Sequence, residues 1–190
     1  MAHFELQPQA ERLQELADEY WRKATERERE LERAAFEAGA AIRSVQNGDY
    51  SLSNLEAIVR WKSHRVVPHL CKNHKEKIDA AITVAASPGS STRDALEALV
   101  ELRGVGIPVA SAILTAIFPE RYTVLDFRAL EALGYLQQDV RFYEEYLEFC
   151  RRSADSGKVK PQDELPAPTA LRALDRALWQ WSKNAFGGSR

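Results

Sequence analysis

The sequence predicts an all-α fold. Apolar residues recur at helical spacing along most of the chain, and runs rich in Glu, Ala, Leu and Arg dominate. Segments with the alternating pattern of strands are few. The 190 residues suit one domain of two helical lobes, and a hydrophobic content of 45% is ordinary for a globular protein with a buried core.

The first expected helix covers residues 9 to about 45. Its apolar positions approximate one stripe, made of Leu13, Leu16, Ala17, Tyr20, Trp21, Ala24, Leu31 and Ala35. The run from Glu26 to Arg33 alternates in charge sign, which is typical of a solvated helix face. A turn at Asn47-Gly48-Asp49 ends this segment.

Shorter helices are expected in the rest of the chain. Ser53 is a candidate cap for a helix through Trp61, and Pro68 follows a break. The other expected helices cover about 74–86, 92–102, 108–118, 126–133, 139–154 and 167–185. A polar loop that contains prolines separates the last two.

Several classes of protein are disfavoured. No segment reaches the roughly 20 apolar residues of a membrane span, and the N-terminus does not resemble a secretory signal, so we expect a cytoplasmic protein without a membrane partner. Cys71 and Cys150 are expected to be buried, reduced thiols. Two thiols cannot ligate an iron–sulfur cluster or a four-cysteine zinc site, so no metal cluster is expected.

The charge is unevenly distributed although the net charge is only −2. Residues 60–77 contain six basic side chains and one acidic side chain, whereas both flanking segments are net acidic. A compact basic segment is typical of a surface that binds a polyanion. A solvated helix face is the simpler explanation, and the charge pattern alone favours it.

The segment from Leu96 to Leu114 carries the most informative pattern. A helix ends at Leu102, a Gly-Val-Gly turn follows, and an apolar helix begins at once. The glycines permit positive φ at either position and leave backbone N–H groups bare, which suits a phosphate at the start of the next helix. The candidate DNA-backbone contacts here are Arg103, Gly104, Val105, Gly106, Pro108 and Ala110. A helix corner with a glycine C-cap is the alternative.

These residues resemble the helix-hairpin-helix DNA glycosylase superfamily, which contains endonuclease III, adenine glycosylases and alkyl-base glycosylases. The segment Leu102-Arg-Gly-Val-Gly-Ile-Pro-Val-Ala-Ser-Ala-Ile-Leu114 is similar to the hairpin of that superfamily, and Asn73-His-Lys75 is similar to its Asn-x-Lys segment. Members carry a catalytic aspartate at the head of a helix, and Asp126 lies 20 residues after Gly106 in Tyr122-Thr-Val-Leu-Asp126. The resemblance covers about residues 70–134.

The resemblance implies that Asp126 is the catalytic carboxylate of a base-excising enzyme. A fixed carboxylate near C1′ stabilises the positive charge that develops on the sugar, and it can orient or deprotonate the attacking water. The target base first leaves the helix and enters a pocket. A role as helix N-cap is the alternative for Asp126, and the two roles are compatible.

Two departures from the superfamily narrow the expected chemistry. Bifunctional members have a nucleophilic lysine two residues after the second glycine, where this sequence has Pro108. Proline has no amine for a Schiff base, so the resemblance implies a monofunctional enzyme without lyase activity of that kind. The cluster-binding cysteines of some members are also absent, so no cofactor is implied.

Further site residues lie outside the hairpin. Arg65 and Lys75, together with Arg60 and Lys62, are candidates for phosphate contacts. The candidates for the base pocket or for a wedge that replaces the flipped base are Trp61, Tyr122, Gln46 and Asn47. Trp179 and Trp181 are expected to be packing residues. The spacing of His64, His69 and His74 does not place them on one helix face, so no metal site is expected.

Three functions are compatible with the sequence. The first is a DNA glycosylase that removes a damaged base, or a modified pyrimidine of phage DNA in antiviral defence. The second is a non-catalytic helix-hairpin-helix DNA-binding protein, and the third is a helical protein-interaction domain. We expect a monomer of one domain over residues 1–190, with the hairpin in a lobe of about 50–134 and with 1–49 and 135–190 in the other lobe.

Overall fold

The computed structural model describes residues 4–45, 48, 50–135 and 140–187. These residues form helices joined by turns and loops, with no strand among them, which confirms the all-α expectation. No helix within the described residues is long and apolar enough to cross a membrane.

The N-terminal segment forms two long helices where one was expected. A short 3-10 helix η1 (Ala10–Arg12) leads into α1 (Leu13–Lys23), and α2 (Glu26–Ser44) begins after Thr25. The Thr25 hydroxyl accepts the Glu28 N–H at 3.2 Å, and the Glu28 carboxylate accepts the Thr25 N–H at 2.7 Å. This capping box starts a new helix and turns the chain.

Seven of the remaining helices agree with the expected ones to within a few residues, whereas the two short helices at His64–Val66 and Val67–Leu70 were not expected. In chain order, the remaining helices are α3 (Leu52–Ser63), η2 (His64–Val66), α4 (Val67–Leu70), α5 (Lys75–Ala86), α6 (Thr92–Val100), α7 (Ile107–Ile117), α8 (Phe127–Glu131), α9 (Val140–Asp155) and α10 (Ala170–Phe186). The cap expected at Ser53 is wrong, because α3 begins at Leu52 and the N-cap position belongs to Ser51.

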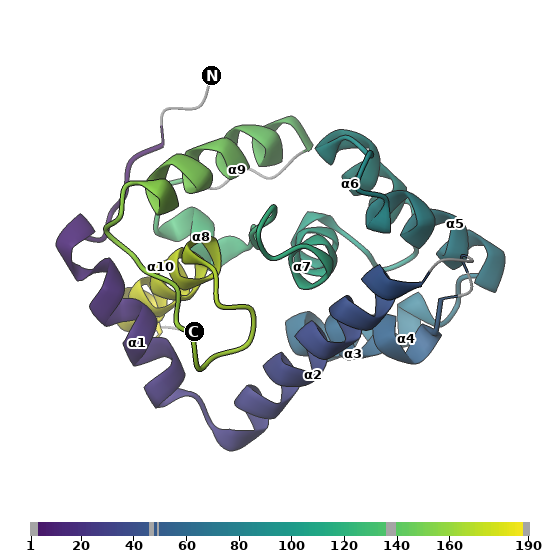
Figure 1. Ribbon diagram of the computed structural model, residues 1–190, viewed down its shortest axis with the longest axis horizontal. Coiled ribbons are helices and arrows are strands. Elements are labelled where there is room, and N and C mark those ends of the chain that lie inside the picture. Colours follow the sequence, from purple (N-terminus) through teal and green to yellow (C-terminus); the bar gives the residue numbers. More distant parts are fainter. Residues whose placement is uncertain (1–3, 46–47, 49, 136–139, 188–190) are drawn as a thin grey trace.

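Helix α7 occupies the centre of the molecule, and the other helices surround it (Figure 1). Every residue from Val109 to Ile117 is buried. Helices α2, α3 and α6 pack against α7, while α1, α8 and α9 pack against α10. Helix α2, which we expected in the lobe of the chain termini, therefore packs with the hairpin helices, and α8 packs with the terminal ones.

The tightest helix crossing joins α2 to α7 at Gly39. A Cβ atom at Gly39 would lie 2.0 Å from the carbonyl oxygen of Ala116, which is backbone and cannot move aside. At Ala116 the close approach is made by α2.

The two cysteines differ in environment. Cys150 is buried as expected, but Cys71 is exposed, so the expectation of two buried thiols is wrong for Cys71. The Cys71 thiol donates to the carboxylate of Glu56 at 3.2 Å. Within the described ranges, no group of three or more His, Cys, Asp or Glu side chains could hold a metal ion.

Candidate functional site

The hairpin between α6 and α7 is held by the side chain of Asn73. Its amide oxygen accepts the Arg103 N–H at 2.8 Å, and its amide nitrogen donates to the carbonyls of Leu70 at 2.8 Å and Arg103 at 3.3 Å. The Asn73 side chain thus connects the end of α4 to the start of the Gly-Val-Gly turn. The hairpin and the basic segment 60–77 are therefore neighbours in space.

Only one of the two hairpin glycines adopts the positive φ that glycine permits. Gly104 has φ +87°, and a Cβ there would lie 2.6 Å from the Cβ of His69. Gly106 has an extended backbone with φ −97°, and the nearest atom to its added Cβ would be the Pro108 Cδ at 3.8 Å. Gly104 is required by conformation and space, whereas Gly106 leaves an open surface.

The hairpin leaves three backbone amides without a hydrogen-bond acceptor in the described part of the chain, those of Gly104, Gly106 and Ile107. The N–H of Val105 donates to Leu102 at 3.0 Å, and the N–H of Ala110 donates to Gly106 at 2.9 Å. The side chains of Val105 and Ala110 are also buried. These two residues are core residues, so our assignment of them as DNA contacts is wrong.

The other hairpin candidates remain accessible. Arg103, Gly104 and Gly106 are exposed, and Pro108 is half-buried at the first turn of α7. Arg65 on η2 and Lys72 after α4 are exposed as well. Lys75 is exposed and pairs with Asp79 at 2.6 Å. The amides of the turn that lack an acceptor and the basic side chains of the segment 60–77 thus lie on neighbouring parts of the structure.

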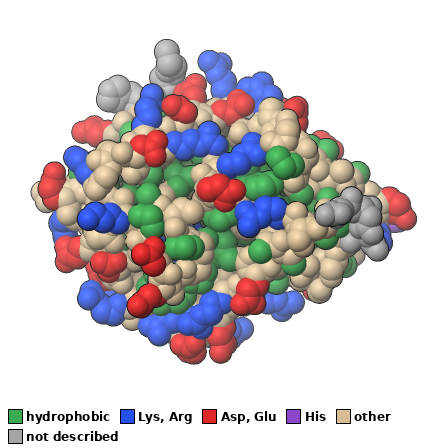
Figure 2. All heavy atoms as spheres, viewed as in Figure 1, with side chains coloured by type: hydrophobic (Ala, Val, Ile, Leu, Met, Phe, Trp, Pro, Cys, Tyr) green, Lys and Arg blue, Asp and Glu red, His purple; other side chains and the backbone are tan. Residues whose placement is uncertain are grey.

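The face seen in Figure 2 carries no continuous basic surface. Acidic and basic side chains are interspersed on it, with apolar side chains exposed between them near the middle. A polyanion would therefore not bind this face through net charge alone.

Helix α7 also positions the segment that ends at Asp126. The Ser111 hydroxyl, one turn into α7, accepts the Leu125 N–H at 3.0 Å. From the other side, the hydroxyls of Tyr143 and Tyr146 on α9 donate to the carbonyls of Thr123 at 3.0 Å and Val124 at 2.9 Å. Three buried side chains therefore fix the backbone immediately before Asp126.

Asp126 is both the N-cap of α8 and one member of a buried ion pair. Its Oδ1 accepts the N–H groups of Arg128 and Ala129, each at 3.0 Å. Its Oδ2 contacts the Nζ of Lys62 on α3. The side chains of Asp126 and Lys62 are only 10% and 16% exposed. One oxygen thus holds the carboxylate in place, while the other faces a cation.

The surroundings keep Asp126 ionised. Burial raises the pKa of Asp126, but the positive charge and hydrogen bond of Lys62 and the two amides of α8 outweigh it, so the pKa lies below its ordinary value. An ionised carboxylate can stabilise a developing positive charge and can accept a proton.

Asp126 and Lys62 line a pocket of about 200 Å³. The pocket lies between the helices that pack against α7 and those that pack against α10. The pocket residues are Tyr20, Ala24, Glu28, Leu31, Trp61, Lys62, Val124, Asp126, Arg172, Asp175, Trp179 and Lys183. This volume is below the roughly 300 Å³ at the lower end for drug-sized ligands, so the pocket suits one small group.

Aromatic rings and cations form much of the pocket lining. Arg172 lies 5.2 Å from the centre of the Trp61 ring, and Lys183 lies 4.8 Å from the centre of the Trp179 ring. Trp61, a candidate for the base pocket, lies in the lining of this pocket. Tyr122 is buried and does not line the pocket, so its assignment to the pocket is wrong. Trp179, which was expected to be a packing residue, lines the pocket. Gln46 and Asn47 lie outside the described residues.

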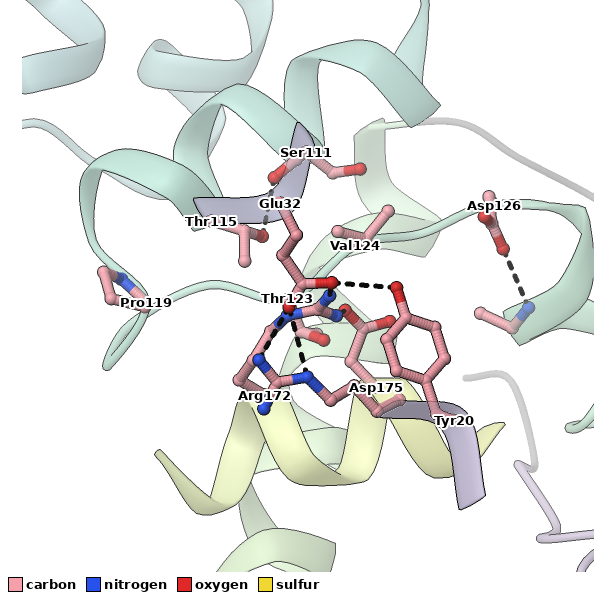
Figure 3. Close-up of polar contacts among 12 residues, drawn as sticks. Tyr20, Glu32, Ser111, Thr115, Pro119, Thr123, Val124, Asp126, Arg172 and Asp175 are labelled. Atoms are coloured by element: carbon pink, nitrogen blue, oxygen red, sulfur yellow. Dashed lines mark hydrogen bonds and ion pairs between the residues drawn. The ribbon is translucent and has the colours of Figure 1, made fainter. Parts of the chain in front are cut away.

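A buried network of charges supports the wall of the pocket. Glu32 on α2 accepts from Arg176 at 2.6 Å. It also pairs with Arg172 at 3.0 Å and accepts from the Tyr20 hydroxyl at 2.9 Å, and Figure 3 shows these two side chains facing it. Arg172 also pairs with Asp175. Glu32 is only 1% exposed, so the expected solvated face is wrong at this position. The network joins α1 and α2 to α10.

The two aspartates of the pocket have opposite electrostatic environments. Burial raises the pKa of Asp175 to about 6 although Arg172 lies beside it, and the negative charge of Asp126 adds to the rise. The pKa of Asp126 is lowered, as described above. Of the two, Asp126 is the carboxylate that remains charged over the whole neutral and mildly acidic range.

Sequence reasoning missed most of this pocket. Tyr20, Arg172, Asp175 and Lys183 were not considered, and Lys62 was considered only as a phosphate contact. These residues come from α1, α3 and α10, and no motif links them. No protein-family model, no curated protein and no solved structure matches this chain. Its function is therefore inferred from its own residues.

Proposed function

We propose that this protein is a DNA glycosylase that flips a modified or damaged base into the pocket and hydrolyses its N-glycosidic bond. The observation that carries the proposal is the buried, ionised carboxylate of Asp126 in a pocket lined by aromatic rings. The hairpin before it, where the amides of Gly104, Gly106 and Ile107 have no acceptor within the described residues, supports DNA as the polymer that is bound.

The lining of the pocket suits an extrahelical base. Trp61, Tyr20 and Trp179 offer ring surfaces on which a planar base can stack. Unpairing a base costs a few kcal/mol, and the cost is smaller for a damaged or mismatched base. Stacking in the pocket offsets part of that cost and thereby favours modified bases.

Asp126 supplies the charge that hydrolysis requires. As the bond between C1′ and the base nitrogen breaks, its electron pair leaves with the base and positive charge develops on the sugar. The Asp126 carboxylate stabilises this charge. A water molecule then attacks C1′ and transfers a proton to the carboxylate. The capping bonds at Oδ1 hold the carboxylate rigidly during these steps.

The experiment uses duplex oligonucleotides with a panel of damaged or modified bases, and includes phage DNA with hypermodified pyrimidines. Abasic products are revealed by cleavage with alkali. The key variant is Asp126→Asn, because asparagine caps a helix as well as aspartate does and removes only the charge. We expect excision by the wild type, loss of excision by the variant, and DNA binding by both.

Thermal melting of both proteins provides the control for folding. Lys62 loses its counter-ion in Asp126→Asn, so the double variant Lys62→Gln/Asp126→Asn restores charge balance and must be inactive too. Excision that survives in a folded Asp126→Asn protein would refute the assignment. DNA binding without excision on the whole panel would instead indicate the non-catalytic DNA-binding protein.

A further inference from the structure

A group of aromatic and basic side chains lies at the edge of the pocket, on α8 and α10, which pack against each other. Its members, which we call the α8–α10 patch, are Phe127, Arg128, Trp179, Lys183 and Phe186. Trp179 and Lys183 belong to the pocket lining, whereas Arg128 lies outside it. The patch therefore extends from the pocket onto the surface beside it.

Two cations of the patch share one aromatic ring. The guanidinium carbon of Arg128 lies 4.9 Å from the centre of the Trp179 ring, and the Nζ of Lys183 lies 4.8 Å from the same centre. The two charges are therefore no more than about 10 Å apart, which is the screening length at 0.1 M salt. An anion beside the ring interacts with both of them.

Neither cation forms an ion pair within the described residues, in contrast to Lys62, which pairs with Asp126. The Nη1 of Arg128 donates to the Ser182 hydroxyl at 3.2 Å, and this hydroxyl in turn donates to Glu131. Arg128 is thus held by a neutral group, and its positive charge remains available to an external anion.

Glu28 is the carboxylate of the pocket lining that interacts with Lys183. Hydrogen bonds from Thr25 lower the pKa of Glu28, and the positive charge of Lys183 adds to this effect. The carboxylate accepts the Thr25 N–H at 2.7 Å and the Thr25 hydroxyl at 2.8 Å, so the capping box holds it. The ammonium of Lys183 therefore lies over the Trp179 ring instead of in an ion pair.

Exposed aromatic side chains flank the two cations. Phe127 is 46% exposed and Phe186 is 43% exposed, and the only other large hydrophobic side chain that is exposed in the described ranges is Leu52. Phe186 follows Lys183 by three positions, so the two lie on one face of α10. Cations interleaved with exposed rings are typical of a surface that binds a nucleic-acid strand.

We propose that the α8–α10 patch is a second DNA contact, in which Arg128 and Lys183 bind the phosphates next to the flipped nucleotide. The proposal rests on the proposed function, because that function places a base in the pocket. Lys183 lines the pocket and Arg128 lies beside it. A nucleotide whose base enters the pocket therefore brings its own phosphates close to these two cations.

The patch and the hairpin hold the DNA at two separate places. The hairpin belongs to the helices that pack against α7, whereas the patch belongs to those that pack against α10. Phosphate contacts fix the position of a protein on DNA without reading its sequence. Contacts in both groups of helices restrain the strand on either side of the pocket, whereas the hairpin alone would leave the flipped nucleotide free to move.

The test measures binding to a duplex that contains one stable abasic analogue, so that it does not depend on excision. The variants are Arg128→Gln, Lys183→Gln and the double variant. Lys160→Gln is the control, because it removes the same charge from an exposed lysine outside the pocket lining. Each patch substitution should reduce the slope of log affinity against log salt by about 1, and the double variant by about 2, whereas Lys160→Gln should leave the slope unchanged.

A scan of the phosphates locates the contact on the DNA. Methylphosphonate linkages, which carry no charge, replace single phosphates on either side of the abasic analogue. We expect a neutral linkage next to the analogue to weaken binding by the wild type. The same linkage should have little effect on the double variant, because the interaction has already been lost. Thermal melting of each variant checks that it is folded.

The outcomes distinguish the patch from the proposed function. Unchanged salt slopes in folded variants, or a wild type that tolerates every neutral linkage beside the analogue, would overturn the contact and leave Arg128 and Lys183 as packing partners of Trp179. Excision of bases by the same preparation would then leave the glycosylase intact. Reduced slopes without excision of any base in the panel would support the contact and reject the glycosylase. A wild type that does not bind DNA would overturn both.

Discussion

The carboxylate of Asp126 contacts the amine of Lys62, which lies 64 positions earlier in the chain. Asp126 is the N-cap of α8 and Lys62 lies in the last turn of α3, so the contact joins these two helices across the pocket. Because both side chains are largely buried, loss of either one leaves the other as an uncompensated charge. The ion pair therefore affects both the stability of the site and the pKa of Asp126.

Replacing Lys62 should change the pH dependence of excision. Lys62 lowers the pKa of Asp126 against the effect of burial, so in Lys62→Gln the pKa of Asp126 should rise. Since the ionised form is active, the acid limb of the excision profile should move to higher pH. Single-turnover rates over a pH series measure this. Lys77→Gln, outside the pocket, is the matched control, and an unchanged acid limb in Lys62→Gln would contradict the assignment.

Replacing Glu32 should destabilise the fold. Glu32→Gln leaves Arg172 and Arg176 without their shared counter-charge, and breaking a buried pair typically costs about 3–5 kcal/mol. Denaturant unfolding measures the loss. The control is Glu30→Gln on the same helix, where the side chain is exposed and an effect within about 0.5 kcal/mol is expected. Equal effects of the two substitutions would show that the network is not stabilising.

A methyl group at Gly39 should not be accommodated. In Gly39→Ala the new atom meets the Ala116 carbonyl at the crossing of α2 and α7, and overpacking of this kind costs about 1–3 kcal/mol or more. Thermal melting should show a clear decrease in Tm. Gly89→Ala, where the nearest atom is a serine hydroxyl oxygen at 3.9 Å, should melt close to the wild type.

The two hairpin glycines should respond differently to alanine. Gly106→Ala is compatible with the backbone, so the protein should fold normally while DNA affinity falls, because the methyl group obstructs the accessible amides. Gly104→Ala is strained by positive φ and by contact with His69, so stability itself should fall. Melting and salt-dependent DNA binding distinguish the two. Full DNA affinity in Gly106→Ala would exclude the hairpin as the phosphate-binding element.

Helical periodicity predicted the helices well, because burial of one face is a local property of the sequence. The prediction of one continuous helix is wrong at Ala24–Thr25, although the apolar spacing continues approximately through this break. The signal was Thr25 followed by Glu28, a capping-box pattern within a charged run. The prediction used the apolar spacing and not this local hydrogen-bonding pattern, so one helix was expected where two exist.

The candidate site was predictable only in part. Asp126 could be singled out because its distance from the hairpin is a property of one continuous segment. Lys62, Asp175 and Arg172 reach the pocket through the packing of α3 and α10, which depends on contacts between distant segments. Glu32 illustrates the same difficulty, because its charged neighbours suggest solvent and only its partners 140 and 144 positions later explain its burial.

The dependence of Glu32 on α10 sets an order for folding during synthesis. The hairpin, Asn73 and the Lys62–Asp126 pair lie between residues 62 and 126, so their partners have all emerged from the ribosome well before the chain is complete. Glu32 cannot be desolvated until Arg172 and Arg176 arrive. A nascent chain can therefore form its hairpin corner first, and the pocket is completed only when α10 has been made, so a product that lacks α10 also lacks the pocket.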